Sequence, residues 1–302
     1  MANFYDLNEA QQVERLHTLA AVALQDWSIE NADIRLLKHR ENSVFAVVTP
    51  AGERFALRVH RHQYHSDAAL RSELQWMAAL NDAGVFTPQA IPSRDGSLFE
   101  VVQVDAVPEP RQCDLLTWVD GNPLGSIEEG KGESAAELSA KYEIVGELAA
   151  QVHNQAASWE LPQGFERHAW DVDGLVGENP FWGRFWELPA LNGEQRELIQ
   201  RARQHVAEVL TEFGLGSDRY SLIHADFLPE NLMVNGSDIQ LIDFDDSGFG
   251  WHLFEFATSL FFDLGEDHFD TVFDAMVRGY RKHRELPDAH LELMPVFFMA
   301  RA

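Results

Sequence analysis

The order of the predicted elements places this sequence in the α+β class, with an antiparallel sheet in its first part and mostly helices in its second part. Apolar stretches that suit strands occur at residues 34–37, 41–48 and 54–59, and the turn residues Pro50 and Gly52 separate the last two. From residue 138 onwards, apolar residues recur every three or four positions over long stretches, as in amphipathic helices. Strands followed by helices are the order expected of an α+β protein.

The first part is predicted to begin with a helix and to hold two further strands. Residues 9–25 carry apolar side chains at helical spacing, which predicts an amphipathic helix on the outside of the sheet. A second helix is expected from Ser66 and Asp67, which suit a helix N-terminus, to Asn81. The remaining strands of this part are predicted at residues 98–104 and 112–119.

The second part is predicted to be mainly helical. Residues 126–136 are rich in Gly, Glu and Ser and suit a surface loop. Helices are expected at residues 138–154, 194–213, 253–264 and 268–283. In the second of these helices the residues expected to face inward are Leu198, Ala202, Val206, Val209 and Phe213.

Length, charge and cysteine content narrow the class of protein. The 302 residues suffice for one large or two modest domains, and a formal net charge of −26 argues against nucleic acid or an anionic membrane as a partner. The single cysteine, Cys113, excludes an intramolecular disulfide and a thiol-rich zinc site. Without a signal pattern or a long apolar run, a cytoplasmic location is expected. The chain stops within the apolar run LMPVFFMARA, so we expect a truncated C-terminus.

The stretch from Leu222 to Asp246 carries the candidate chemistry. Its apolar pieces 232–234 and 239–242 suit two short strands, joined at Asn235-Gly236 by a turn that Ser237 and Asp238 lengthen. Such a hairpin would bring the residue before its first strand close to the residue after its second. Those residues are Asn231 and Asp243, and Asp226 lies a few positions upstream. Three oxygen-bearing side chains in this order predict a Mg²⁺ site that also activates a hydroxyl.

The spacing of these residues resembles the catalytic and metal loops of kinases. The form HADFLPEN followed by LIDFDDSGFG is similar to the aminoglycoside phosphotransferase and choline kinase-like family, which includes type II homoserine kinases and a bacterial stress-response Ser/Thr kinase. The resemblance implies a two-lobed protein-kinase-like fold, with an antiparallel sheet plus helix in the N-lobe and a mostly helical C-lobe. It places the nucleotide-binding N-lobe at residues 1–116, a hinge at 117–121 and the C-lobe, with both loops, at 122–302.

The resemblance also implies a role for each candidate residue. Asp226 would be the catalytic residue, with Asn231 and Asp243 as metal ligands for Mg²⁺ bound with ATP. The turn at Asn42 and Ser43 would cover the nucleotide phosphates, although no glycine lies between Leu36 and Val48. The hinge residues Thr117 and Val119 would meet the adenine through the backbone.

Arg58 stands where the family usually has a lysine that pairs with the phosphates. Its expected partner is Glu73, which lies within the apolar stripe of the helix at 67–81 and needs a cation, because an unpaired buried charge is costly. Two alternatives stay open. Arg58 would otherwise be a cation on the strand surface, and Glu73 would otherwise reach water at the edge of the stripe.

The predicted function is transfer of the γ-phosphoryl group of ATP to a hydroxyl of a small molecule, such as an amino alcohol or a homoserine-like or aminoglycoside-like compound. A Ser/Thr protein kinase and a nucleotide-binding protein without turnover are the alternatives. The aromatic and acidic residues of 165–186 suit a cationic substrate, but ordinary packing explains them somewhat better. The oligomeric state is left open.

Overall fold

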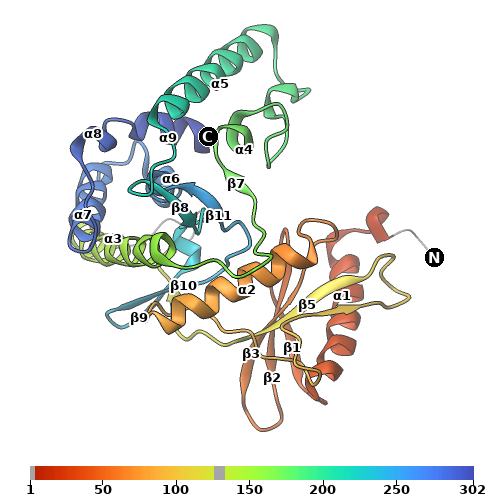
Figure 1. The fold of residues 1–302 in the computed structure, drawn as a ribbon. Coiled ribbons are helices and arrows are strands. Elements are labelled where there is room, and N and C mark those ends of the chain that lie inside the picture. The colour runs from red at the N-terminus through yellow and green to blue at the C-terminus, as the bar shows by residue number, and fades with distance from the viewer. Residues whose placement is uncertain (1–3, 126–132) are drawn as a thin grey trace. The chain divides into compact units, whose positions relative to one another are not determined.

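The computed structural model describes residues 4–125 and 133–302, which divide into two units (Figure 1). Unit 1 consists of the chain up to Ala79 together with Thr87–Val119 and Gln163–Glu166. Unit 2 consists of Leu80–Phe86, Asp120–Pro162 and Arg167–Ala302. Most of the loop predicted at 126–136 lies outside the described residues. The predicted hinge at 117–121 stays a prediction.

Unit 1 is built on one antiparallel sheet of five strands in the order β1-β2-β3-β5-β4. Its elements are the 3₁₀ turn Phe4–Asp6, α1 (Glu9–Ala23), the 3₁₀ turn Leu24–Trp27, β1 (Asp33–His39), β2 (Ser43–Val48), β3 (Arg54–Val59), α2 (Asp67–Asp82), β4 (Glu100–Val102) and β5 (Arg111–Thr117). The predicted helices and strands of this part are therefore confirmed, although β4 is shorter than expected because its pairing with β5 covers three residues.

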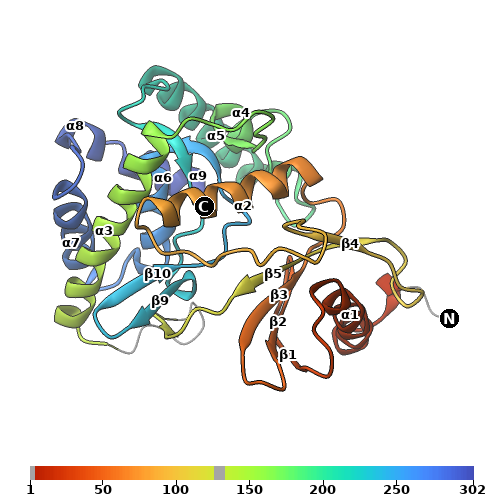
Figure 2. The ribbon, with the colours of Figure 1, turned by 60° about the horizontal axis from the view of Figure 1, so that its bottom comes forward.

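The two faces of this sheet carry different residues. Strand alternation turns Leu57 and Leu115 toward α1, where they join a buried apolar core with α1 residues such as Leu19. The same alternation turns Arg58 and Asp114, which are paired across β3 and β5, to the other face. Figure 2 shows α1 beside the β1–β3 part of the sheet.

The helix α2 lies on the face that carries Arg58. The Ser66 hydroxyl accepts the Ala69 N–H at 3.0 Å, so this residue begins the helix as expected. The apolar stripe of α2 is buried, and Glu73 within it has no exposed surface. Its carboxylate contacts the Arg58 guanidinium, which fixes α2 against this face of the sheet.

Unit 2 combines two small sheets with helices. Its described elements are β6 (Asn122–Pro123), α3 (Ala135–Ser158), β7 (Ala169–Trp170), α4 (Val172–Val176), a 3₁₀ turn (Phe185–Glu187), α5 (Gly193–Phe213), β8 (Tyr220–Ile223), a 3₁₀ turn (Pro229–Asn231), β9 (Leu232–Asn235), β10 (Asp238–Leu241), β11 (Gly248–Trp251), α6 (His252–Leu260), a 3₁₀ turn (Phe261–Asp263), α7 (Phe269–Arg281), α8 (Asp288–Leu291) and α9 (Met294–Arg301). The sheets have the orders β10-β9-β6 and β7-β11-β8. The α+β class is therefore confirmed.

The helices α3 and α7 pack closely because each has a glycine at their contact. A Cβ on Gly146 of α3 would lie 2.0 Å from the Met276 carbonyl oxygen, and a Cβ on Gly279 of α7 would lie 1.8 Å from that of Glu143. Any side chain at either position would push the helices apart.

Two details of the predicted unit 2 elements are wrong. The hairpin turn has two residues, Gly236 and Ser237, because Asp238 pairs with Asn235 instead of lengthening the turn. In α5, Leu198 is not buried but 59% exposed, because it lines an open pocket together with residues of α9 such as Met299. Short elements, α4, α9 and the 3₁₀ turn before α5, cover this helix, so its buried residues are Val206 and Leu210.

Among the helices of residues 4–125 and 133–302, none combines the length and apolar character that a membrane crossing requires.

Candidate active site

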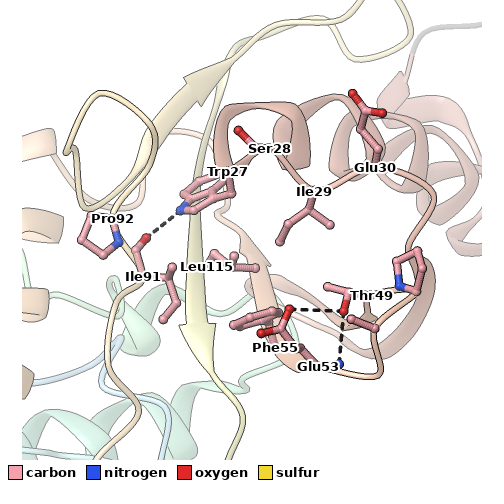
Figure 3. A pocket seen from close by; sticks show the side chains of 12 residues that line it. Trp27, Ser28, Ile29, Glu30, Thr49, Glu53, Phe55, Ile91, Pro92 and Leu115 are labelled. Carbon is pink, nitrogen blue, oxygen red and sulfur yellow. Dashed lines mark hydrogen bonds between the residues drawn. The ribbon is translucent and has the colours of Figure 1, made fainter.

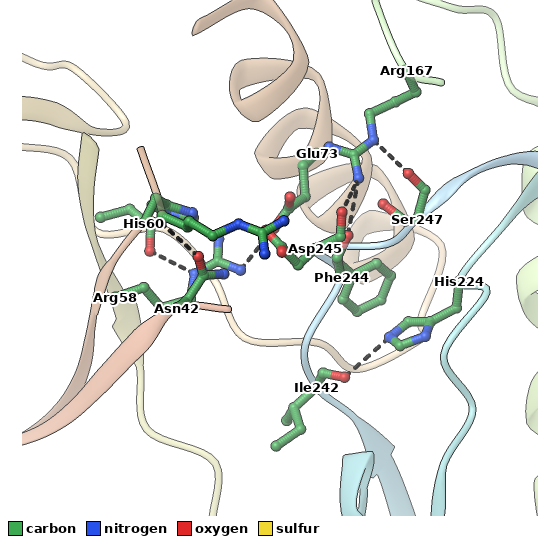
Figure 4. Close-up of polar contacts among 12 residues, drawn as sticks. Asn42, Arg58, His60, Glu73, Arg167, His224, Ile242, Phe244, Asp245 and Ser247 are labelled. Carbon is green, nitrogen blue, oxygen red and sulfur yellow. Dashed lines mark hydrogen bonds and ion pairs between the residues drawn. The ribbon is translucent and has the colours of Figure 1, made fainter. Parts of the chain in front are cut away.

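His224 connects the loop after β8 to the end of β10. Its Nε2 donates to the Ile242 carbonyl oxygen at 3.0 Å (Figure 4). Its Nδ1 accepts the Asp226 N–H at 3.2 Å. The ring also packs edge-on against Phe244, with centroids 4.5 Å apart. Because both ring nitrogens are used in this way, His224 braces the loop and is not placed to transfer a proton.

Ala225 holds a strained backbone conformation next to the candidate catalytic residue. Its φ of 65° lies in the left-handed region, which is costly for a residue other than glycine, on the order of 1–3 kcal/mol. The Glu255 carboxylate, fully buried on α6, accepts the Ala225 N–H at 2.6 Å. This contact fixes the backbone from which the Asp226 side chain projects.

Asp226 and Asn231 contact each other directly. The Asn231 Nδ2 donates to the Asp226 Oδ2 at 2.7 Å and to its carbonyl oxygen at 3.0 Å. The 3₁₀ turn that starts at Pro229 makes this possible, because it curls the chain back toward Asp226. With the amide nitrogen used here, Oδ1 is the atom of the Asn231 side chain that suits a cation.

The β9–β10 hairpin brings the backbone just before Asp243 into contact with Asn231. The register pairs Leu232 with Leu241, and the Ile242 N–H donates to the Asn231 carbonyl oxygen at 3.1 Å. Asp243 follows immediately with a left-handed φ of 66°. The Asn231 amide oxygen and the Asp243 carboxylate are hard oxygen donors, so this pair fits Mg²⁺ and similar divalent cations.

The turn after Asp243 is held by residues 167–170, near the start of the aromatic and acidic segment 165–186. Side chains of Arg167, His168 and Trp170 donate to backbone carbonyl oxygens of residues 244–247. Trp170 has no exposed surface and packs against Phe181. For this tryptophan, packing is therefore the correct interpretation of the aromatic segment.

In unit 1, Arg58 is enclosed by two carboxylates. Its Nε and Nη2 donate to Asp114 at 2.9 and 2.8 Å. Its Nη1 donates to Glu73 at 2.8 Å, and Figure 4 shows both of these residues. His60 Nε2 lies 2.8 Å from Asp114 Oδ2. All four side chains are buried, so the alternatives of a surface cation at Arg58 and a water-exposed Glu73 are excluded.

Asp114 explains why an arginine is suited to position 58. A lysine has no planar fork and cannot hold both oxygens of one carboxylate in parallel. Burial acts to raise the pKa of Asp114, but Arg58 and His60 outweigh it and hold that pKa well below its ordinary value. Asp114 is therefore ionised beside the Arg58 guanidinium.

The other predicted nucleotide residues make hydrogen bonds within unit 1. The Asn42 Oδ1 accepts the Arg61 N–H at 3.0 Å, and the Ser43 hydroxyl lies 2.7 Å from His39 Nδ1. The Thr117 hydroxyl accepts the Gln89 N–H at 2.9 Å. Val119 follows β5 outside regular structure. The contacts of the first three stabilise turns and strand ends, and their role toward a nucleotide stays a prediction.

Unit 1 also contains a cavity of about 450 Å³, which Figure 3 shows. Trp27, Phe55 and Leu115 line it together with the turn around Thr49. Because Phe55 and Leu115 project to the α1 side of the sheet, this cavity opens on the face opposite to Arg58. It is therefore separate from the Arg58 cluster.

Sequence reasoning missed Asp114, Glu255 and Arg167. The first two had a usable signal, because each is an acid inside an otherwise apolar strand or helix, as Glu73 is. Arg167 had no such signal, since it precedes β7 in an irregular segment.

Known proteins resemble this chain over nearly all of its length. The model of the phosphotransferase enzyme family matches residues 33–293. A solved microcompartment-associated aminopropanol kinase is 34% identical, covers 94% of this chain and 86% of its own, and superposes with a TM-score of 0.82. Amicoumacin kinase of Bacillus subtilis strain 168 is 23% identical over 291 residues, 93% of this chain and 81% of that protein.

A second amicoumacin kinase, hAmiN, is known in complex with AMP-PNP and Ca²⁺. It is 18% identical, covers 97% of this chain and 84% of its own, and has a TM-score of 0.76. These likenesses confirm the protein-kinase-like fold that the two motifs implied.

Replacement of Arg58 should destabilise the protein. Arg58→Met leaves Glu73 and Asp114 buried without their cation, which should lower the free energy of unfolding by about 3–5 kcal/mol in urea denaturation. Arg58→Lys keeps the charge but loses the bidentate contact with Asp114, so its free energy of unfolding should fall by less. The triple variant Arg58→Met, Glu73→Leu, Asp114→Leu should regain much of the lost free energy of unfolding. Equal stability of Arg58→Met and the wild type would contradict the ion-pair assignment.

Glu255 should make stability depend on pH. Burial, with Asp226 adding to it, raises the Glu255 pKa from 4.5 to about 8 against the opposing Ala225 N–H bond. Between these values the unfolded chain has lost a proton that the folded protein keeps, so the Glu255 contribution to stability falls as pH rises. Relative to the wild type, Glu255→Gln should gain stability from pH 5 to pH 8 in denaturant titrations. A difference that stays constant over this range would refute the assignment.

Proposed function

This chain belongs to the phosphotransferase enzyme family, and on that premise we propose that it transfers the γ-phosphoryl group of ATP to the hydroxyl of a small amino alcohol. One observation carries the proposal. Asp226 projects from a loop that His224 and Glu255 fix, and it contacts Asn231, which the hairpin joins to Asp243. A carboxylate beside two hard oxygen donors is the set that phosphoryl transfer to a hydroxyl requires.

Asp226 acts on the acceptor. Its carboxylate accepts the hydrogen of the acceptor hydroxyl, so that the hydroxyl oxygen can bond to the γ-phosphorus while the bond from phosphorus to the β-phosphate oxygen breaks. The Asn231 Nδ2 holds the carboxylate through Oδ2 during this step. Positioning of this kind, together with electrostatic stabilisation, supplies most of the rate enhancement in phosphoryl transfer.

The Asn231 amide oxygen and the Asp243 carboxylate hold Mg²⁺ in this proposal. When bound, the ion neutralises charge on the nucleotide phosphates. Support for a divalent cation comes from the donor types and from the Ca²⁺ bound with AMP-PNP in the related hAmiN. The identity of the ion as Mg²⁺ is part of the proposal.

Arg58 is the proposed cation on the nucleotide side, set in place by Glu73 and Asp114. Because its Nε, Nη1 and Nη2 each donate to one of these acids, a positioning role within unit 1 has equal support. Asn42, Ser43, Thr117 and Val119 stay proposed nucleotide contacts through their backbone groups.

An amino alcohol is the proposed acceptor. The support is the 34% identity with the aminopropanol kinase and a net charge of −26 that favours cations over anions. A homoserine-like or aminoglycoside-like acceptor, and a Ser/Thr protein kinase, are tested as alternatives below. The cytoplasmic location stays a prediction.

Replacement of Asp226 should separate chemistry from binding. Asp226→Asn keeps the size of the side chain but cannot accept the hydroxyl proton, so kcat should fall by about 10²- to 10⁴-fold in a coupled ADP assay. Nucleotide affinity in calorimetry should stay nearly unchanged. Asp238→Asn, the same substitution at an exposed acid of the β9–β10 hairpin, is the control and should keep full activity. Full turnover in Asp226→Asn would remove Asp226 from the mechanism.

A panel of acceptors should identify the substrate class. With Mg²⁺ and ATP, kcat/KM should be highest for aminopropanol or ethanolamine, compared with homoserine, an aminoglycoside and a protein extract. Propanediol, which lacks the ammonium group, should be a poorer acceptor by at least about 10²-fold. Preferential labelling of proteins would support the protein kinase instead. Nucleotide binding without transfer to any acceptor would support a protein without turnover.

A further inference from the structure

Residues 167–170 run beside the turn that follows Asp243, within unit 2. β7 pairs in parallel with β11, with Ala169 opposite Phe249. The Phe249 N–H donates to the His168 carbonyl oxygen at 3.0 Å. Gly248 allows this approach, because a Cβ there would lie 2.6 Å from the His168 carbonyl oxygen. The two segments are therefore in backbone contact.

Side chains of this segment donate hydrogen bonds to four consecutive backbone carbonyl groups, those of residues 244–247. Arg167 Nη2 donates to the carbonyl oxygens of Phe244 at 3.3 Å and Asp245 at 2.5 Å, and its Nε donates to that of Ser247 at 2.5 Å (Figure 4). The carbonyl oxygen of Asp246 accepts from Trp170 Nε1 at 2.8 Å and faces His168 Nε2 at 3.2 Å. All four carbonyl oxygens thus meet one short segment.

An arginine suits this place for two reasons. Several carbonyl oxygens that converge on one point create a region of negative potential, which a buried cation offsets. A guanidinium also carries donors in more than one direction, so that one side chain reaches three carbonyl groups. Arg167 is 8% exposed, so water is largely kept from replacing it.

The backbone on both sides of Asp243 is therefore anchored. Before it, Ile242 bonds through its N–H to Asn231 and through its carbonyl oxygen to His224. After it, Arg167 holds the carbonyl groups of the next residues. Asp243 itself has the left-handed φ of 66°, which an unanchored turn would relax.

We propose that Arg167 is a positioning residue for Asp243, and that it sets the affinity of the site for the divalent cation. This inference rests on the proposed function, in which Asp243 is a metal ligand. Residues that orient metal ligands without touching the metal commonly change metal affinity by about 10- to 100-fold when they are replaced. Arg167 acts in this way through the backbone of residues 244–247.

The test measures Mn²⁺ binding by electron paramagnetic resonance, with the full chain and saturating AMP-PNP. Arg167→Lys keeps the charge but cannot reach three carbonyl groups, so the Mn²⁺ Kd should rise about 10- to 100-fold. Arg196→Lys is the matched control. Arg196 also donates to three backbone carbonyl oxygens, those of Trp186, Leu188 and Leu191, but away from the metal loop, so its Mn²⁺ Kd should not change.

Trp170→Phe keeps the proposal testable if Arg167→Lys does not fold. It removes the indole N–H that donates to Asp246 and keeps an aromatic ring, so the Mn²⁺ Kd should rise severalfold. An unchanged Mn²⁺ Kd in the folded Arg167→Lys protein would overturn the inference. If only Trp170→Phe folds, an unchanged Mn²⁺ Kd in that variant would also overturn it. A rise in the Mn²⁺ Kd of Arg196→Lys as large as that of Arg167→Lys would do the same.

The same experiment separates this inference from the proposed function. Mn²⁺ binding with AMP-PNP requires neither an acceptor nor turnover, so the wrong acceptor does not affect it. A wild type that binds Mn²⁺ but transfers no phosphoryl group would count against the proposed function alone. A wild type that transfers phosphoryl groups, with Arg167→Lys unchanged in Mn²⁺ affinity, would count against the inference alone.

Discussion

The burial of ionisable side chains constrains a cluster of candidate residues in each of the two units. Glu73, Asp114 and Glu255 have no exposed surface, and a carboxylate that leaves water must meet donors or take up a proton. In unit 1 the Arg58 fork satisfies two of these acids, which fixes α2 and two strands relative to one another. In unit 2, Glu255 keeps its proton to about pH 8 and still accepts the Ala225 N–H.

The two strained residues of unit 2 are held in complementary ways. Ala225 and Asp243 both have left-handed φ values, 65° and 66°, and stand at or next to a proposed site residue. A buried acid, Glu255, holds an N–H of the first loop, whereas a buried base, Arg167, holds carbonyl groups of the second. Each loop therefore depends on a buried side chain whose hydrogen-bonding type matches the backbone group that it binds, an acceptor for the N–H and donors for the carbonyl groups.

Local signals were enough to predict most elements and the order of the candidate residues. The β9–β10 hairpin, α2 and the first three strands follow from apolar periodicity, which depends on neighbouring residues alone. Glu73 could be paired with Arg58 because a charge in an apolar stripe needs a partner and the motif placed the arginine. The predicted turn length of the hairpin and the predicted burial of Leu198 were wrong. The register of β9 and β10 decides the first, and the elements packed against α5 decide the second.

The missed residues show where such reasoning stops. Asp114 interrupts an apolar strand just as Glu73 interrupts an apolar helix, so its need for a cation was visible, but its partner lies 56 residues away and follows from the register of β3 and β5. Arg167 lies 77 to 80 residues from the carbonyl groups that it binds. Every residue has a backbone carbonyl group, so the sequence does not indicate which of them an arginine will bind. A buried charge can therefore be recognised from its apolar neighbours when its partner is a side chain. When its partner is the backbone of a distant turn, only the folded chain reveals the pair.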